Sequence, residues 1–465
     1  MCDESRSAAA PGLHPDSVGG AVLVVGAGEA GSRVAGALAG RGAPVVVLSP
    51  DGSPGVELPP LSKKLFAESL TLTAHSVDPA AADSGPGHAV SGGSSVALLQ
   101  GAAVELDLDT RSVRLDTGEW VHGSAIVIAT GSAARILDIE LPGGPAFTLH
   151  SAADAQAIRE HLAALRSGSA QDTPVDIGII GSGFLALELA RGAVDAGHTA
   201  TVHLNGPRPL PRLSAPLSDA VMALHESAGV RFVPHSTPVD YVARDFWITA
   251  VGAQAATNFA GQDVQRTSAG ALLTDAHLRV LAAGGAPLEA VYAIGDCGQV
   301  AHGPMAAYGP QESEPVAASQ GEWLGRCLGA ASNHAESPGP AEPDPSEHVE
   351  PGHSAPTAAW SDLPWHWSFQ GPVRVFTAGM SAAASQGEPV VLGDLATGSG
   401  QVALFASAAD DAPLVGVETL GPPKPHLAAR RLLASGTVPT RGQVSAPGFD
   451  LVTASRLAGS GPARA

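Results

Sequence analysis

The 465-residue chain is poor in cysteine, aromatic residues and positive charge. Its three cysteines, Cys2, Cys297 and Cys327, form no closely spaced pair, which argues against a disulfide framework, a zinc site and a redox-active dithiol. Lysine and arginine number 25 against 45 acidic residues, so the formal net charge is -20. Nucleic acids and anionic membranes both require clustered positive charge, and the composition therefore argues against either as a partner.

Long apolar runs are also missing. No apolar stretch is long enough, and free enough of Gly, Pro and polar residues, to span a membrane. The N-terminus, MCDESRSAAAPGLHP, lacks the apolar segment of a signal peptide. The sequence therefore predicts a cytoplasmic protein with reduced thiols and no bound metal.

What the chain does contain is two copies of one α/β pattern. Residues 21–48, AVLVVGAGEAGSRVAGALAGRGAPVVVL, predict a strand, a glycine turn, a helix and a second strand, and residues 176–204 repeat the pattern. Near-continuous apolar strands are typical of buried parallel sheets. We therefore predict an α/β fold with two Rossmann-like dinucleotide-binding domains. Alternating apolar and polar residues after Trp360 predict a C-terminal α+β domain with antiparallel strands.

The expected domain boundaries follow from these patterns. Residues 21–150 and 275–328 are expected to form one domain that is split around a shortened second unit, residues 151–274. The C-terminal domain is expected over residues 360–465. A polar tail, residues 1–20, and a Pro- and acid-rich linker, residues 329–359, contain too few large apolar residues to offset the entropy cost of ordering.

The first unit carries the fingerprint Gly26, Gly28 and Gly31. The first glycine permits a tight turn, the second lets the backbone approach a pyrophosphate, and the third lets the helix pack on the strand. The phosphate then lies at the helix N-terminus, where free N–H groups and the helix dipole favour negative charge. Asp51, beyond the second strand, is the candidate ribose ligand, and an ordinary turn aspartate is the alternative.

The second unit carries Gly181, Gly183 and Ala186, and alanine can replace the third glycine. The acid expected at the end of its second strand, where it would bind the adenosine ribose, is replaced by Leu204, and Asn205 offers one neutral hydrogen bond. A lost charge-assisted hydrogen bond costs about 1.5–3 kcal/mol. The sequence therefore leaves weak use of NAD(P)H, or none, as alternatives, and two arginines, Arg208 and Arg212, leave a 2′-phosphate open as a ligand.

Two further turns follow buried strands. AIGDC places Gly295 and Asp296 at a strand end, where a carboxylate can bind the ribityl chain of a flavin. In IVIATG, Thr130 and Gly131 turn the chain closely past a cofactor. Together with the first fingerprint, these turns predict one bound FAD per chain.

The order of the motifs GAGEAG, PPLSKKL, IVIATGSAAR, GSGFLALELA, VYAIGDC and PWHWSFQ resembles that of the FAD-dependent ferredoxin reductases of the putidaredoxin and rubredoxin reductase type. The resemblance covers the chain from Ala21 to about Val444. It implies an FAD domain split around an NAD(P)H domain, and a C-terminal domain that covers the flavin. It also implies hydride transfer from the nicotinamide to the flavin, with single electrons then leaving to a small iron–sulfur ferredoxin that serves an oxygenase or P450.

The resemblance also implies roles for single residues. Lys63 is expected beside the flavin ring, Arg135 is expected to reach the FAD, and Trp367 is expected to approach the isoalloxazine. Glu188 matches a glutamate near the nicotinamide, and Gly252 matches a turn of the NAD(P)H site. The catalytic candidates are therefore a lysine, a glutamate and a tryptophan from three distant parts of the sequence.

Other interpretations of these residues remain open. Without the resemblance, Lys63 would be a solvated lysine, and Trp367 would be a core residue on the same strand face as Trp365. His366, where the family usually has an aromatic residue, is expected at the surface. In addition, Leu58 stands where the family has an arginine, so one FAD contact is expected to be missing.

Three functions follow as alternatives. The first is an FAD enzyme that passes electrons from NAD(P)H to a [2Fe-2S] ferredoxin. The second is a flavoenzyme that has abandoned NAD(P)H and acts on a small organic substrate. The third is a non-catalytic scaffold that binds FAD.

Overall fold

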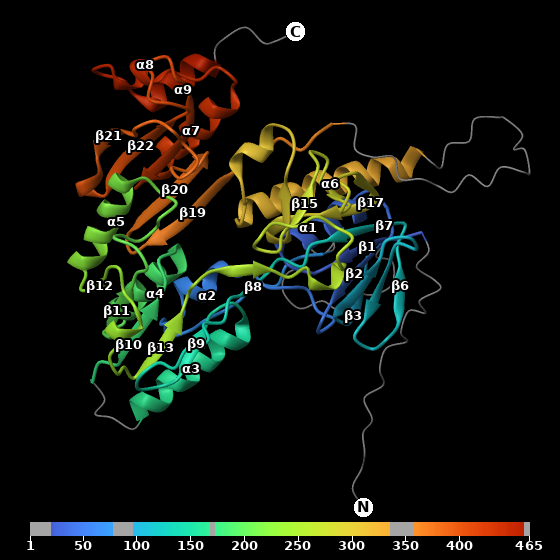
Figure 1. The fold of residues 1–465 in the computed structure, drawn as a ribbon, viewed down its shortest axis with the longest axis horizontal. Coiled ribbons are helices and arrows are strands. Elements are labelled where there is room, and N and C mark those ends of the chain that lie inside the picture. Colours follow the sequence, from blue (N-terminus) through green and yellow to red (C-terminus); the bar gives the residue numbers. More distant parts are fainter. Residues whose placement is uncertain (1–19, 78–95, 168–172, 335–357, 460–465) are drawn as a thin grey trace, which may run out of the picture.

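The computed structural model describes residues 20–77, 96–167, 173–334 and 358–459. These residues form two lobes, with the N-terminal strands in one lobe and the second glycine unit together with the C-terminal sheet in the other (Figure 1). The predicted tail and most of the predicted linker lie outside the described residues. Residues 329–334 of that linker belong to helix α6 (Glu314–His334), so the helix extends past the composition change near residue 329.

The first lobe is built on an eight-stranded sheet with the order β18-β15-β16-β17-β7-β1-β2-β3. Five neighbouring strands are parallel, and they are β17 (Pro287–Ala293), β7 (Ala125–Ile128), β1 (Val22–Val25), β2 (Val45–Ser49) and β3 (Val96–Gln100). The other three are β18 (Gly298–Val300), β15 (Leu272–Thr274) and β16 (Arg279–Leu281). Strands β1 and β7 are buried on both faces, as their continuous apolar sequences predict.

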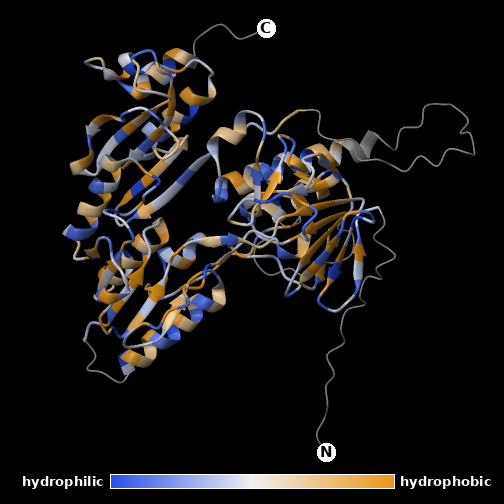
Figure 2. Cartoon of the chain, in the orientation of Figure 1, coloured by the Kyte–Doolittle hydropathy of each residue, from blue (hydrophilic) through white to orange (hydrophobic). Residues whose placement is uncertain are grey.

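A different layer of secondary structure packs on each face of this sheet. On one face lie helices α1 (Glu29–Ala39) and α6, and on the other lies a three-stranded antiparallel sheet. The strands of this small sheet are β4 (Ala103–Asp107), β5 (Ser112–Leu115) and β6 (Trp120–His122). Figure 2 shows the large sheet as mainly apolar, in keeping with its place between two layers.

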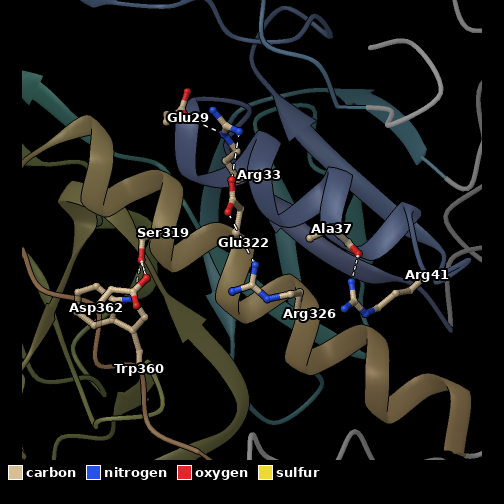
Figure 3. Close-up of polar contacts among 9 residues, drawn as sticks. All are labelled: Glu29, Arg33, Ala37, Arg41, Ser319, Glu322, Arg326, Trp360 and Asp362. Carbon is tan, nitrogen blue, oxygen red and sulfur yellow. Dashed lines mark hydrogen bonds and ion pairs between the residues drawn. The ribbon is translucent and has the colours of Figure 1, made fainter. Parts of the chain in front are cut away.

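Helices α1 and α6 pack closely because α6 presents glycine to α1 at every fourth residue. A Cβ atom on Gly321 would lie 2.4 Å from the carbonyl oxygen of Ala30, and one on Gly325 would lie 2.6 Å from the Ala37 Cβ. Ion pairs lie along the edge of this contact, where Arg33 bonds Glu29 at 2.7 Å and Glu322 at 3.2 Å (Figure 3). The contact fixes the N-terminus of α6 relative to that of α1.

The second sheet is fully parallel, with the order β12-β11-β10-β13-β9. Its strands are β9 (Ala146–Thr148), β10 (Asp176–Ile180), β11 (Thr199–His203), β12 (Arg231–Val233) and β13 (Phe246–Thr249). Its helices are α3 (Ala152–Ser167), α4 (Phe184–Asp195) and α5 (Ala215–Ser227). Between β12 and β13 the chain forms only the short 3-10 helix η3 (Pro238–Asp240).

The second sheet does not fill the expected range of residues 151–274. It begins earlier, because the edge strand β9 is only three residues long and follows a Pro-Gly-Gly segment with no periodic pattern. It ends earlier because strand β14 (Ala253–Ala255) pairs with β8 (Ser132–Ala134) and β15 already belongs to the first sheet. Strands β8 and β14 form an antiparallel ribbon between the lobes (Figure 1).

The C-terminal region is an antiparallel sheet with helices at one side, as the alternating sequence predicts. Its strand order is β19-β20-β23-β22-β21. The strands are β19 (Trp365–Gln370), β20 (Val373–Gly379), β21 (Val390–Asp394), β22 (Ser399–Phe405) and β23 (Leu414–Leu420). The helices are α7 (Pro423–Ala434), α8 (Arg441–Ser445) and α9 (Leu451–Gly459). The predicted fold class, two Rossmann-like units followed by an α+β domain, is therefore confirmed.

Across the described residues, no helix combines the length and apolar character needed to cross a membrane.

Candidate functional site

The first glycine turn lies between β1 and α1. Gly26 has a φ of 112°, and a Cβ atom there would lie 2.3 Å from the carbonyl oxygen of Ala129. A Cβ atom on Gly31 would lie 2.0 Å from the carbonyl oxygen of Gly26, whereas one on Gly28 would have nothing within 4 Å. No described side chain caps α1. The turn therefore leaves open space and free N–H groups at the helix N-terminus, the arrangement that binds a phosphate.

Asp51 lies in the turn after β2 and is exposed. Its Oδ1 atom accepts hydrogen bonds from the backbone N–H of Ser53 at 3.1 Å and from the hydroxyl of Ser49 at 3.1 Å. The bonds from Ser53 hold the pKa of the Asp51 carboxyl below its usual value. The side chain thus organises its own turn, and only Oδ1 takes part in these bonds.

The turn after β7 contains a buried hydroxyl that lacks a partner. The Oγ1 atom of Thr130 is buried and makes no hydrogen bond within the described part of the chain. Next to it, Gly131 has a φ of 63°, and the Ser132 hydroxyl donates to Asp296 Oδ2 at 3.0 Å. Burial raises the pKa of the Asp296 carboxyl. A buried, unpartnered hydroxyl and a partly buried carboxyl at neighbouring strand ends suit a ligand rich in hydroxyl groups.

Asp296 is fixed from the side of α6. Gly295 and Asp296 lie in the short 3-10 helix η5 (Gly295–Cys297), where Gly295 has a φ of 67°. The backbone N–H of Gly295 donates to Gln320 Oε1 at 2.8 Å. Because α6 packs on α1, this bond ties the Asp296 turn to the first glycine turn.

A pocket of about 520 Å³ lies where the first unit, the second unit and the C-terminal sheet meet. Lys63 reaches it from α2 (Pro59–Lys63), Glu188 from α4, and Trp367 from β19. The structure thus brings together the three residues that the sequence predicted as catalytic. Figure 1 shows how α2 leaves the first lobe and lies against α4.

Glu188 is the centre of this pocket's hydrogen bonding. Its carboxylate lies 3.2 Å from Lys63 Nζ, and it accepts hydrogen bonds from the Ser62 hydroxyl and from the Ser368 hydroxyl at 2.5 Å. The backbone N–H of Phe369 donates to it at 3.2 Å. The Lys63 ammonium also lies 4.7 Å from the centroid of the Trp367 ring, within cation–π range. Lys63 is therefore not a freely solvated lysine, because its ammonium contacts both a carboxylate and an aromatic ring.

The second glycine turn repeats the geometry of the first. A Cβ atom on Gly181 would lie 2.3 Å from the carbonyl oxygen of Ala250, and one on Gly183 would have nothing within 4 Å. Ala186 is fully buried and is the third residue of α4. A phosphate cradle is therefore present in the second unit as well.

The end of β11 differs from the sequence-based expectation. Leu204 is fully buried and packs in the apolar core of the second unit, so it does not occupy a position that faces a ribose. The side chain beside the glycine turn belongs to Asn205, whose Oδ1 accepts a hydrogen bond from the Ser182 hydroxyl at 2.9 Å. Strand alternation continues one residue beyond β11, which turns residue 204 inward and leaves Asn205 at the edge.

Two family models match the chain. Residues 20–321 match pyridine nucleotide-disulphide oxidoreductase, and residues 365–455 match reductase C-terminal. The chain belongs to the pyridine nucleotide-disulphide oxidoreductase family. It is accordingly an FAD-dependent oxidoreductase, and members of this family typically use NAD(P)H.

Its relatives include several ferredoxin reductases. Rhodocoxin reductase of Rhodococcus erythropolis is 25% identical over 454 residues, which cover 92% of this chain and 93% of that protein. The ferredoxin–NAD(+) reductase component of the anthranilate 1,2-dioxygenase system of Burkholderia cepacia is 28% identical over 440 residues, which cover 93% and 98%.

Solved structures share the fold. The ferredoxin reductase for the CYP199A2 system from Rhodopseudomonas palustris superposes with a TM-score of 0.72 at 22% identity, and the match covers 94% of this chain and 99% of that one. The reductase in the covalent putidaredoxin reductase–putidaredoxin complex gives 0.71 at 21% identity, with the same coverage.

The first unit of this oxidoreductase fits FAD. The open space at Gly28 suits a pyrophosphate, and the unpartnered Thr130 hydroxyl and the partly buried Asp296 carboxyl suit a polyol chain. Despite the family's name, Cys297 and Cys327 are free thiols, and Cys297 is buried. Cys2 lies outside the described residues.

Two residues singled out in the sequence make contacts that the sequence did not indicate. Arg135 bonds the β8–β14 ribbon, since its Nε donates to the carbonyl oxygen of Ala253 at 2.9 Å and its backbone N–H donates to that of Gly252. His366 is not a surface residue: it is partly buried and stacks on Phe184 with ring centroids 4.9 Å apart. Burial lowers the pKa of His366 to about 4, and this apolar contact explains why an aromatic residue also suits the position.

Sequence reasoning missed the residues that hold the candidates in place. Ser62 and Ser368 both donate to Glu188, and Gln320 fixes the Asp296 turn. Each lies next to or near a motif residue, but a serine or glutamine in a loop or helix carries no pattern of its own. Only the serine between Trp367 and Phe369 could have been noticed, because it is a polar residue at an inward strand position.

Proposed function

We propose that this flavoprotein passes electrons from NADH or NADPH through FAD to a small [2Fe-2S] ferredoxin, which in turn serves an oxygenase or a P450. The observation that carries the proposal is the pocket where Lys63, Glu188 and Trp367 meet from three parts of the chain. The names of the relatives support it, since they reduce ferredoxins or rhodocoxin. When bound, FAD accepts a hydride and releases its two electrons singly.

The residues of the first unit would hold FAD along a line from the glycine turn to the pocket. The N-terminus of α1 would bind the pyrophosphate, Asp51 the adenosine ribose, and Thr130 and Asp296 the ribityl chain. Lys63 would then present its ammonium to the flavin ring, while Glu188 holds that ammonium in place. Trp367 would cover the ring from the C-terminal sheet.

The second unit would bind the nicotinamide nucleotide through its phosphates. The open turn at Gly183 supports this, because the phosphate cradle needs backbone N–H groups and not particular side chains. At the ribose end, Asn205 would replace the usual acid. A neutral amide neither grips both ribose hydroxyls nor repels a 2′-phosphate, so we expect poor discrimination between NADH and NADPH.

The whole chain has a net charge of -20, which would repel an acidic ferredoxin. The C-terminal region nevertheless offers arginines to which such a ferredoxin could dock. A second pocket, of about 450 Å³, is lined by Trp365, Arg430 and Arg431 among others. The guanidinium of Arg430 lies 4.3 Å from the centroid of the Trp365 ring. Trp365 is two residues from Trp367 on strand β19, so the two tryptophan side chains lie on the same face of that strand, one lining this second pocket and the other the flavin pocket.

Anaerobic stopped-flow reduction of the purified holoprotein tests the proposal. We expect both NADH and NADPH to bleach the flavin absorbance, and the reduced enzyme to pass electrons to [2Fe-2S] ferredoxins from a test panel. Substituting Arg431→Glu, on the exposed face of α7, should weaken ferredoxin reduction without slowing flavin bleaching. Bleaching by neither nucleotide would instead favour a small organic substrate, and a protein that cannot be loaded with FAD would contradict the assignment of the first unit.

A further inference from the structure

A chain of buried polar side chains runs behind the flavin pocket. It starts at His225 on α5, passes Gln370 and Ser368 on β19, and ends at Glu188 on α4. His225 and Gln370 are 0% exposed, Ser368 is 1% exposed and Glu188 is 8% exposed. Four polar side chains in contact within a core are costly unless their hydrogen bonds are satisfied.

The contacts along this chain are short. His225 Nε2 lies 2.8 Å from Gln370 Oε1, Gln370 Nε2 donates to Ser368 Oγ at 2.7 Å, and Ser368 Oγ donates to Glu188 Oε1 at 2.5 Å. Glu188 then contacts Lys63, which lines the pocket. The chain therefore connects helix α5 of the second unit to the lysine at the flavin site.

The direction of every hydrogen bond is fixed. A serine hydroxyl has one proton, and Ser368 gives it to the carboxylate because the Gln370 amide donates to its oxygen. The Gln370 carbonyl oxygen must then accept, so the donor is the Nε2–H of His225. Burial lowers the pKa of His225 to about 4, which leaves a neutral ring with one N–H, and its Nδ1 has no partner within the described residues.

All donors therefore point toward Glu188. Aligned hydrogen bonds polarise one another, so the negative charge on Glu188 is stabilised from the core side. On the pocket side, the same carboxylate holds the Lys63 ammonium over the Trp367 ring. The Ser62 hydroxyl and the Phe369 N–H also bind this carboxylate, so an apolar residue at 370 or 368 would weaken its orientation, and with it the placing of the ammonium, without abolishing them.

We propose that His225, Gln370 and Ser368 are positioning residues, which fix Glu188 and, through it, the Lys63 ammonium at the flavin. The inference rests on the proposed place of Lys63 beside the flavin ring. It also makes the reactivity of the flavin depend on how α5 and β19 pack. A cation held near the ring stabilises the reduced, anionic flavin, so the positioning residues raise the reduction potential of the bound FAD.

The test is the reduction potential of FAD, measured by slow enzymatic reduction against a reference dye and therefore independent of NAD(P)H. We expect Gln370→Met and Ser368→Ala to lower the equilibrium constant for flavin reduction about 10-fold, the scale of one charge-assisted hydrogen bond. Ser368→Thr keeps the hydroxyl and should keep the potential. Lys63→Met should change the potential in the same direction and by more.

The matched control is Ser214→Ala. Ser214 begins α5, and its hydroxyl and backbone N–H both bind the buried Glu418 carboxylate of β23 at 2.5 and 3.0 Å. This variant removes an equally buried bond between the same two regions but lies off the chain to Glu188. We expect a lower melting temperature with an unchanged potential.

The measured potentials distinguish a failure of the positioning role from a failure of the proposed place of Lys63 at the flavin. A wild-type potential in both Gln370→Met and Ser368→Ala, with a changed potential in Lys63→Met, overturns the positioning role alone. An equal change of potential in Ser214→Ala also overturns it, because the effect would then be one of general packing. An unchanged potential in Lys63→Met overturns the proposed place of Lys63, and the positioning role with it.

Discussion

The two glycine turns of this chain share their phosphate cradle and differ at the ribose end. The first glycines, Gly26 and Gly181, both approach a backbone carbonyl so closely that a Cβ atom would lie 2.3 Å from it. The second glycines, Gly28 and Gly183, both face open space. Beyond the second strand, the first unit has Asp51, which bonds Ser49 at the end of that strand, and the second has Asn205, which bonds Ser182 of the glycine turn.

This difference distinguishes phosphate binding, which depends on the backbone, from recognition of the ribose, which depends on a side chain. A cradle made of N–H groups and a helix dipole needs only small residues, so it is retained although the acid at the ribose end is gone. Discrimination between ribose hydroxyls and a 2′-phosphate depends on one side chain. On the proposed function, binding of a nucleotide and selectivity among nucleotides would therefore be separable in the second unit.

The largest effect is expected at the third position of the fingerprint, where the first unit has Gly31 and the second has Ala186. Gly31→Ala would place a methyl group 2.0 Å from a backbone oxygen that cannot move without opening the turn. We expect the affinity for FAD to fall by roughly 100-fold or more, since overpacking costs about 1–3 kcal/mol and the cradle is displaced as well. Flavin absorbance per protein measures it.

Gly36→Ala is the control for that variant. Gly36 lies in the same helix, and a Cβ atom there would meet nothing within 4 Å. We expect unchanged flavin content and a helix stabilised by about 0.5–1 kcal/mol. Full FAD content in Gly31→Ala would show that the first turn tolerates what the second turn has, and would remove the contrast between them.

The second largest effect is expected at Leu204, which stands where the sequence pattern predicts an acid that binds the adenosine ribose. Because Leu204 is fully buried, Leu204→Glu puts a carboxylate in the core without a partner. We expect a loss of about 3–5 kcal/mol in the free energy of unfolding and no gain of reactivity with NADH. Urea unfolding, with Leu204→Met as a volume-matched control, checks this. A stable Leu204→Glu variant with faster reduction by NADH would put residue 204 at the ribose.

The smallest effect is expected from Asn205→Asp, which keeps the acceptor oxygen for Ser182 and adds a charge. A carboxylate accepts hydrogen bonds from both ribose hydroxyls and repels a 2′-phosphate. We expect the ratio of kcat/KM for NADH to that for NADPH to rise about 10-fold. Asn205→Ser is the neutral comparison. An unchanged ratio in Asn205→Asp would mean that the ribose end of the nucleotide lies away from this turn.

Much of the fold follows from local patterns. The buried strands β1 and β10, their glycine turns and the helices after them are continuous in sequence, and so are the antiparallel strands β19 and β20. The pocket residues were found through motifs, because Lys63, Glu188 and Trp367 each belong to one. The order of those motifs indicated a shared site, although the separations of 125 and 180 residues between Glu188 and its partners gave no local signal.

The rest depends on side-chain direction. Leu204 and Asn205 are neighbours at a strand end, and the motif comparison placed the ribose acid at residue 204, although the alternation of Ala200, Val202 and Leu204 turns that residue inward. The stacking of His366 on Phe184 joins two elements that the sequence keeps far apart. The bond between His225 and Gln370 spans 145 residues, and neither residue belongs to a pattern of nucleotide binding. Contacts of this kind follow from packing between domains.

The β8–β14 ribbon makes the second unit an insertion into the first. The polypeptide leaves the first lobe after Ala134 and returns at Ala253, and these two residues are direct partners in the antiparallel pair. The first lobe therefore needs only Ala134 and Ala253 to lie side by side, whatever length of chain connects them. A chain that joins Ala134 to Ala253 through a tight turn would keep the strand connections of the first lobe, so the strand order of that lobe does not depend on the inserted unit.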